Sequence, residues 1–81
     1  MHKNALDIVH QVTLLGILKK QPGESLEDVM EMLIDTRMYD RAEAAKVLEQ
    51  LRAWGYIVGD GLSFVGVETA KEADTFFKKQ G

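Results

Sequence analysis

The stretch Leu48–Gly66, with the sequence LEQLRAWGYIVGDGLSFVG, joins a helical pattern to the pattern of a glycine-turned hairpin. Its first two leucines lie three residues apart, as on one face of a helix, and Gly55 stands where a left-handed residue would end that helix. We expect strands at residues 56–58 and 62–67 around a turn at residues 59–61, because glycine accepts the positive φ angles of hairpin turns. The stretch therefore predicts a helix that runs directly into a two-stranded sheet.

Two further helices are predicted before this stretch. Residues Asn4–Lys20 carry apolar side chains at helical spacing, and the sequence QPG at residues 21–23 ends the pattern. Ser25 suits the N-cap of the next helix, whose outer side is strongly acidic, and Asp28 stands where it can complete a capping box. The apolar stripes are Ala5, Ile8, Val9, Val12 and Leu15 in the first helix, and Leu26, Val29, Met30 and Leu33 in the second.

Capping boxes also mark the third helix and the last one. Asp40 with Glu43 opens the third helix after a turn at residues 36–39, and Thr69 with Glu72 opens the last helix. The predicted inward-facing residues are Ala44, Val47, Leu48 and Leu51 in the third helix, Ile57, Leu62, Phe64 and Val67 in the hairpin, and Ala70, Ala73, Phe76 and Phe77 in the last helix. The predicted order is therefore helix, helix, helix, hairpin, helix.

The composition is that of an ordinary globular chain, and we assign residues 1–81 to a single domain. Apolar residues make up 46% and charged residues 28% of the chain, and the absence of cysteine excludes a disulfide framework and a thiolate metal site. Asp7, His10 and Gln11 interrupt the first apolar segment before the roughly 20 residues that cross a bilayer. No small-residue cleavage signal follows it. We therefore expect a cytoplasmic protein without a membrane-spanning segment.

This order of elements resembles the winged-helix family over nearly the whole chain. The sequence LEQLRAWGYI, Leu48–Ile57, is similar to the end of that family's recognition helix and its first wing strand, and VETAKEADTFF, Val67–Phe77, to the helix that often follows the wing. The resemblance implies an α+β fold with a three-helix core, a two-stranded wing and a C-terminal helix. It also implies a transcriptional regulator that binds double-stranded DNA through a recognition helix at about residues 40–54. Because the family also contains protein-interaction modules, the fold does not decide the function.

The resemblance places six candidate DNA contacts on the third helix, the turn before it and the wing. A helix in the major groove reads base edges with its outward side chains, and Arg41 could instead pair with Glu43 or with the acids of the second helix. The outward line of the third helix is Ala42, Lys46, Glu49 and Ala53. The candidate contacts are Arg37, Tyr39, Arg41, Lys46, Gln50 and Ser63.

Charge counts against DNA binding. The net charge is −3, and the excess of acid lies in residues 1–40, which hold four basic and seven acidic residues. The tip of the predicted wing carries Asp60, which phosphate groups would repel. The hairpin therefore has an alternative interpretation, in which it only closes the edge of the core.

A second apolar line on the first helix predicts a homodimer. Together with two phenylalanines of the last helix, it forms a candidate seam, because contiguous apolar surface on a small domain usually marks a partner site. The alternative is a first helix that is buried on two sides as the central element of the core. The candidate seam consists of Leu6, His10, Leu14, Ile17, Phe76 and Phe77.

No catalytic, metal or cofactor site is indicated. His2 and His10 have no cysteine or carboxylate at ligand spacing, and no glycine-rich phosphate loop or nucleophile motif is present. Trp54 is expected to cover the edge of the core; if exposed, it would anchor an interface. We expect a protein that is not an enzyme, and two functions stay open. One is a dimeric DNA-binding regulator, and the other is a module that binds a protein through the acidic second helix, Trp54 and the apolar faces of the first and last helices.

Overall fold

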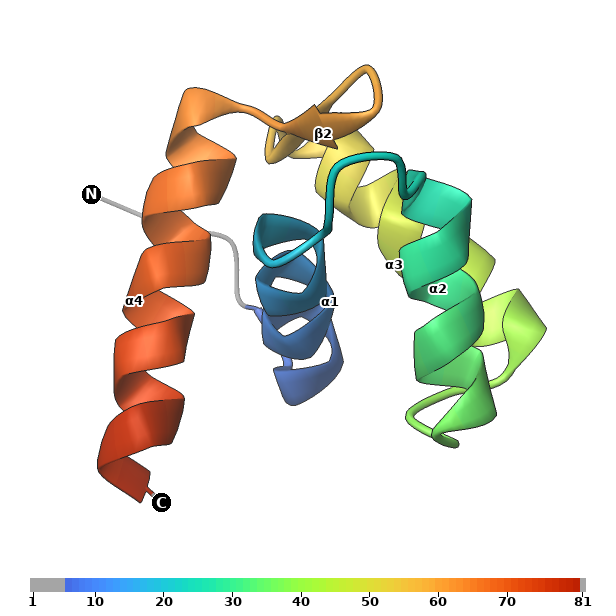
Figure 1. Cartoon of the computed structure of the whole chain (residues 1–81), viewed down its shortest axis with the longest axis horizontal. Helices are drawn as coiled ribbons and strands as arrows, with labels where there is room; N and C mark the ends of the chain where they lie inside the picture. Colours follow the sequence, from blue (N-terminus) through green and yellow to red (C-terminus); the bar gives the residue numbers. More distant parts are fainter. Residues whose placement is uncertain (1–5, 81) are drawn as a thin grey trace.

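A computed structural model describes residues 6–80 of the chain, with side chains described through Lys78. It contains four helices and a two-stranded antiparallel hairpin, in the order predicted from the sequence (Figure 1). The predicted helix start at Asn4 and Ala5, and His2, lie outside the described residues. The elements are α1 (Ile8–Leu18), α2 (Leu26–Asp35), α3 (Arg41–Ala53), β1 (Ile57–Val58), β2 (Gly61–Leu62) and α4 (Phe64–Gln80).

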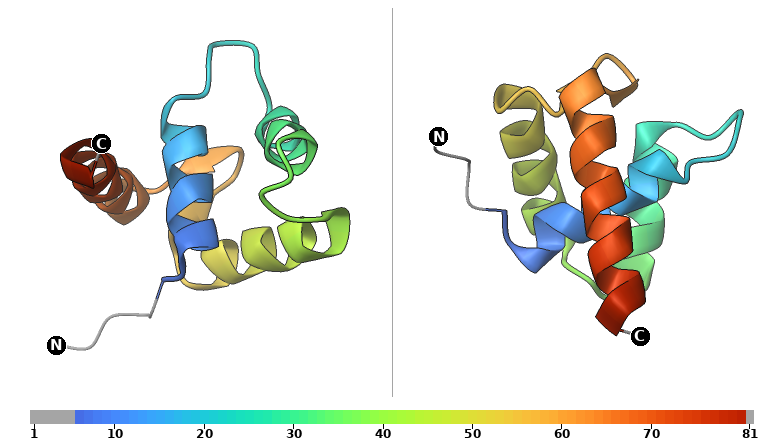
Figure 2. Two further views of the ribbon diagram at one scale, coloured as in Figure 1. Left: turned by 90° about the horizontal axis from the view of Figure 1, so that it is seen from below. Right: turned by 90° about the vertical axis from the view of Figure 1, so that its left-hand side faces the viewer.

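Helix α1 is the central element of the core. Figure 2 shows it between α4 on one side and α2 with α3 on the other, and it contacts all three helices and β2. Its side chains Leu14 and Ile17 are 0% and 4% exposed. Burying a large aliphatic side chain of this kind contributes about 1.5–3 kcal/mol to folding. The core that surrounds α1 includes Val29, Leu33, Val47, Leu51, Ile57 and Ala70.

The second apolar line of α1 therefore packs inside the monomer. The alternative of a helix buried on two sides describes α1, and Leu14, Ile17 and His10 are too buried to lie on an exposed dimer seam. Leu6, which precedes the helix, is half-buried and also packs against the core. The prediction of an exposed line was wrong because the sequence pattern of one helix does not say how many neighbours it has.

Three predicted helix ends are confirmed. Ser25 Oγ accepts from the backbone N–H of Asp28 at 3.1 Å, and a carboxylate oxygen of Asp28 accepts from the backbone N–H of Ser25 at 3.0 Å. Asp40 accepts from the backbone N–H of Glu43 at 2.8 Å and caps α3. Gly55 has a φ of 86° and ends α3, with the next backbone N–H donating to the carbonyl of Leu51 at 2.9 Å.

Within the described residues helix α1 begins at Ile8, so Leu6 and Asp7, which the sequence pattern places in the helix, precede it. Asp7 is its N-cap, with extended backbone angles, and Ile8 is the first helical residue. The side chain of His10, three residues after the cap, accepts from the backbone N–H of Asp7 at 3.2 Å. This bond occupies the place that Glu or Gln takes in a capping box, and it satisfies the backbone N–H of the N-cap residue.

The second strand and the start of α4 differ from the prediction. Strand β2 ends at Leu62, and Ser63 caps α4: its Oγ accepts from the backbone N–H of Gly66 at 3.1 Å, and its carbonyl accepts from that of Val67 at 2.9 Å. The predicted cap at Thr69 lies inside the helix, and Phe64, predicted in the core, is 83% exposed. Phe64, Val65 and Val67 favour a strand locally and Gly66 disfavours a helix, so packing overrides their propensity.

Candidate interaction surface of α2 and α3

The outward line predicted for α3 is confirmed. Ala42, Lys46, Glu49 and Ala53 are all exposed, and their neighbour Glu43 is exposed as well. The line therefore carries one cation, and the acids beside it balance that charge. This surface is mixed in charge, and it is not a basic stripe.

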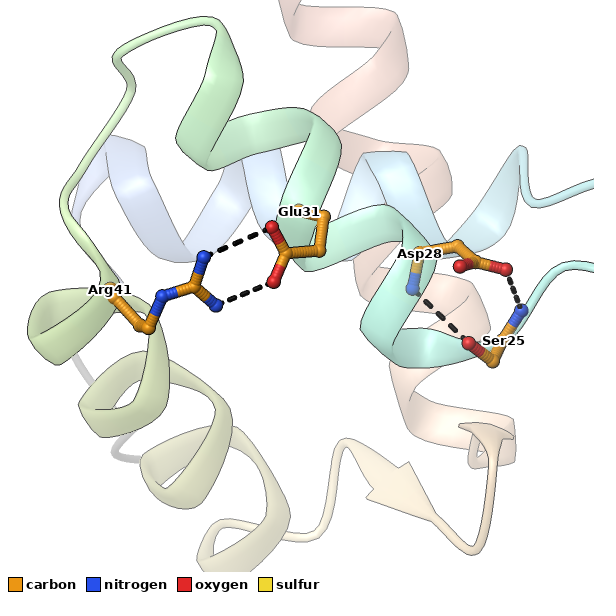
Figure 3. Close-up of polar contacts among 4 residues, drawn as sticks. All are labelled: Ser25, Asp28, Glu31 and Arg41. Carbon is orange, nitrogen blue, oxygen red and sulfur yellow. Dashed lines mark hydrogen bonds and ion pairs between the residues drawn. The ribbon is translucent and has the colours of Figure 1, made fainter.

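The candidate Arg41 forms an ion pair with the acidic helix α2. It reaches from the first turn of α3 to Glu31, and its two terminal nitrogens donate to the two carboxylate oxygens, one of them at 3.1 Å (Figure 3). The hydrogen bond from Arg41 lowers the pKa of the Glu31 carboxyl, and the same bond raises the pKa of Arg41. The sequence alternative in which Arg41 pairs with an acid of the second helix is confirmed.

Tyr39 is a core residue, which corrects its assignment as a surface contact. It is 8% exposed, and its hydroxyl lies 2.9 Å from Thr13 Oγ1. Thr13 Oγ1 also donates to the carbonyl of Val9 at 2.7 Å, and the tyrosine hydroxyl lies 3.8 Å from the sulfur of Met30. Burial raises the pKa of Tyr39, and the hydrogen bond to Thr13 opposes that shift.

Gln50 is also held inside the molecule. The Nδ1 atom of His10 accepts from Asp7, so the proton of the neutral ring is on Nε2, which donates to the side-chain oxygen of Gln50 at 2.8 Å. The Trp54 ring lies against the same imidazole, with the ring centres 5.2 Å apart. Trp54 is half-buried against the core, as predicted. The side-chain oxygen of Gln50 is hydrogen-bonded to α1 and does not face a partner at the surface.

The hairpin tip is fastened to both α2 and α3. Asp60 accepts from the backbone N–H of Leu26, in the first turn of α2, at 3.3 Å. Arg52 of α3 donates to the carbonyl of Gly59 at 3.0 Å. An acid at a helix N-terminus is favoured by the exposed N–H groups and the helix dipole. Sequence reasoning missed these contacts, because nothing in the chain links residue 60 to residue 26 before it folds.

Ser63, the candidate contact on the wing, is part of the fold. Besides capping α4, its hydroxyl donates to the carbonyl of Gly55 at 2.6 Å. The hydroxyl therefore already acts both as a hydrogen-bond donor and as an acceptor within the fold. This residue joins the end of α3 to the start of α4.

Two of the candidate cations, Arg37 and Lys46, make no side-chain hydrogen bond or ion pair within the described residues, and both are exposed. Arg37 has a φ of 66°, the left-handed conformation that favours glycine. It follows α2, where its N–H donates to the carbonyl of Ile34 at 2.9 Å and the N–H of Met38 donates to that of Leu33 at 3.0 Å. Arg37 thus stands at the end of α2 in the position that corresponds to Gly55 at the end of α3.

An open groove of about 390 Å³ runs between α2 and α3. Apolar side chains form its floor, where Ile34 and Leu48 are half-buried and Ala45 is exposed. Three carboxylates and Arg41 form its rim. The complete lining is Glu27, Asp28, Met30, Glu31, Ile34, Arg41, Ala44, Ala45 and Leu48.

The exposed charges of α2, α3 and the turn between them are predominantly negative. Acidic side chains outnumber basic ones on these elements, and some of each kind are already bound within the molecule. Arg41 and Arg52 are the bound basic residues, and Asp28, Glu31 and Asp40 are the bound acidic ones, so the remaining charge is still negative. The exposed acids are Glu27, Asp28, Glu31, Asp35, Asp40, Glu43 and Glu49, and the exposed bases are Arg37, Arg41, Lys46 and Arg52.

Helix α4 carries the remaining residues of the predicted seam. Phe76 is 51% exposed and meets the half-buried Phe77 edge to face, with ring centres 5.7 Å apart. Nearby, Asp74 pairs with Lys19 of α1 and with Lys78, each at 3.5 Å. Among the described residues of the predicted seam, Phe76 is exposed, Leu6 and Phe77 are half-buried, and the others are buried.

No group of three or more His, Cys, Asp and Glu side chains within residues 6–80 is arranged to hold a metal ion. No helix in the described part of the chain combines the length and the hydrophobicity that crossing a bilayer requires. Comparison with known proteins adds no relative: no protein-family model, no curated protein and no solved structure matches this chain.

Proposed function

We propose that this chain is a winged-helix interaction module that binds another protein through the face formed by α2 and α3. The order of three helices, a short antiparallel hairpin and a final helix supports the winged-helix assignment. The negative charge of the α2–α3 face supports a protein partner in place of DNA. That charge is the single observation on which the proposal depends.

DNA binding in the usual geometry would be opposed by α2. In helix-turn-helix proteins the recognition helix enters the major groove while the helix before it crosses the phosphate backbone. Here the preceding helix would bring four exposed acids toward phosphates, and nonspecific affinity for DNA comes from Lys and Arg that displace counterions. The four acids are Glu27, Asp28, Glu31 and Asp35.

The hairpin tip would not supply the missing positive charge. A wing that contacts DNA needs free Lys or Arg at its tip. In this chain the tip carries Asp60, which is held against the first turn of α2, and Arg52 donates to the carbonyl of Gly59. The tip is thus bound to the helices on both sides.

A DNA-binding regulator remains the second candidate, and two residues favour it. Arg37 lies in the turn and Lys46 on the outward side of α3, and both are exposed. Within the described chain neither side chain makes a hydrogen bond or an ion pair. A non-glycine residue held in the left-handed conformation is often kept for a function, which is consistent with a contact at Arg37.

Duplex binding separates the two candidates. We expect a fluorescein-labelled DNA duplex of mixed sequence to show no anisotropy change with this protein at low salt. Binding that weakens with salt, with a slope of log affinity against log salt reduced by about 0.9 in Arg37→Ala or Lys46→Ala, would establish the DNA candidate instead. The matched control is Lys71→Ala, an exposed lysine of α4, which should leave any such slope unchanged.

A further inference from the structure

The shape of the groove between α2 and α3 favours a helical segment as its occupant. Its floor is apolar, and its small side chains Ala44 and Ala45 allow the backbone of a third helix to approach closely. The groove is lined by the stretch from Glu27 to Ile34 of α2 and by the stretch from Arg41 to Leu48 of α3. The hairpin, by contrast, has strands of two residues each and little edge for an extended peptide to join.

The rim of the groove selects a positively charged occupant. Within the described residues, the Glu27 side chain makes no hydrogen bond or ion pair, and the Glu31 carboxylate is bound only by the exposed Arg41. One carboxylate oxygen of Asp28 accepts from the backbone N–H of Ser25. This bond does not neutralise Asp28, which contributes a negative charge to the groove lining. Three carboxylates against one arginine leave the groove negative, and opposite charge on a partner both steers association and fixes its orientation.

We propose that this groove binds a basic amphipathic helix of a partner protein, a conclusion that rests on the protein-binding function proposed above. Leucine-like side chains of the partner lie on Ile34, Ala45 and Leu48, and its lysines or arginines reach Glu27 and Glu31. Arg41 competes with the partner for Glu31, because both are cations that need the same carboxylate. The Arg41–Glu31 pair therefore lowers the affinity of the site and makes it depend on the partner's charge.

A synthetic helix provides the test. The probe is a fluorescein-labelled peptide of about 14 residues, roughly 21 Å long when helical, with leucine on one face and lysine on the other. We expect saturable binding that weakens with salt, and none by the same peptide with glutamate in place of lysine. Amide shifts of the ¹⁵N-labelled protein should map to α2 and α3; shifts confined to α4, or no binding of the lysine peptide, would overturn the proposal.

Two exposed alanines of α3 give a matched pair for the floor. Ala45→Gln places a polar side chain over the floor of the groove and should weaken binding at least about tenfold, the effect expected when an apolar contact of about 1.4 kcal/mol is lost. Ala42→Gln makes the same change on the outward side of α3, beyond the groove lining, and should leave the affinity unchanged. Equal affinities of the two variants would contradict the proposed floor.

The rim has its own pair of variants. Glu27→Gln should weaken peptide binding by about two- to fivefold, and Arg41→Ala should strengthen it by a similar factor, since exposed ion pairs have effects of this size. Glu68→Gln, an exposed acid of α4, is the control and should change nothing. Weaker peptide binding by Arg41→Ala would refute the competition.

If neither duplex DNA nor the lysine peptide binds, the groove proposal fails while the choice of protein over DNA stands. Salt-dependent duplex binding would refute that choice itself.

Discussion

At the scale of single residues, several side chains that the sequence suggests as DNA contacts instead form hydrogen bonds within the molecule. The hydroxyl of Tyr39 is hydrogen-bonded to Thr13, Gln50 accepts from His10, and Ser63 caps α4. Polar groups near a core need partners because burying them without a hydrogen bond is costly. The residue type alone therefore does not distinguish a surface contact from a structural one.

Arg37 gives a prediction at this scale. We expect Arg37→Gly to raise the free energy of unfolding by up to about 1 kcal/mol. The left-handed conformation costs a non-glycine residue about 1–2 kcal/mol, and glycine removes this cost. Part of the gain is lost because glycine also gives the unfolded chain more conformational entropy. Urea denaturation followed by circular dichroism measures the change. Arg37→Ala is the control: it removes the charge but keeps the backbone penalty, so a gain of equal size in both variants would refute the explanation.

Tyr39 predicts a loss of stability in alkaline solution. Burial raises its pKa in the folded state above the unfolded value, so the stabilisation is complete below about pH 10, the ordinary tyrosine value, and is lost as the pH rises through the folded pKa. We expect Tyr39→Phe to lower stability at neutral pH by about 0.5–1.5 kcal/mol, through loss of the hydrogen bond to Thr13, and to lose less stability than the unaltered protein as the pH rises above about 10.

Urea denaturation over that pH range measures both effects. Thr13 keeps its bond to the carbonyl of Val9 in the variant, so no buried hydroxyl is left unpaired to confuse the result. An equally steep alkaline loss in Tyr39→Phe and in the unaltered protein would show that another group is responsible.

At the scale of elements, the start of α4 depends on a close backbone approach. A Cβ atom at Gly66 would lie 2.1 Å from the carbonyl oxygen of Tyr56, which is backbone and cannot swing aside. Glycine thus lets the first turn of α4 pack onto the chain that enters β1, and the Ser63 cap holds it there. Helix propensity alone disfavours glycine at this position, which is why the sequence pattern places the helix start later.

We expect Gly66→Ala to destabilise the protein by about 1–3 kcal/mol, as overpacking does, even though alanine favours helices. Thermal unfolding followed by circular dichroism should show the melting temperature falling by several degrees. Gly61→Ala is the matched control in β2, where an added Cβ meets no atom within 4 Å, and it should change the melting temperature little. A loss in Gly61→Ala as large as that in Gly66→Ala would mean that the close approach is not the cause.

At the scale of the whole molecule, the central position of α1 changes the expected oligomeric state. The dimer seam predicted from the sequence loses Leu14, Ile17 and His10 to the core. The exposed large apolar side chains in the described part of α4 are Phe76 near one end and Phe64 with Val65 near the other. Phe64 and Phe76 lie about 18 Å apart along a helix that rises 1.5 Å per residue. A stable dimer needs about 1,200–2,000 Å² of buried surface, which these separated side chains do not supply.

We therefore expect a monomer in sedimentation velocity at micromolar concentration. The sedimentation coefficient should not change with concentration, and Phe76→Glu should behave like the unaltered chain. A dimer that Phe76→Glu dissociates would restore the predicted homodimer in a smaller form, built on Phe76 and Phe77 alone.

The sequence by itself determined the helices, their caps at Ser25, Asp40 and Gly55, and the presence of a hairpin, because each of these depends on bonds between residues at most five apart. Only the tertiary structure decided which polar residues stay free. Asp60 meets the N-terminus of α2, Arg41 meets Glu31, and Gln50 meets His10 across 34, 10 and 40 residues of chain. Contacts of that range form when helices pack, and the packing follows from how all the apolar faces combine. No local pattern encodes that combination, so the surface charge left for a partner became visible only in the folded molecule.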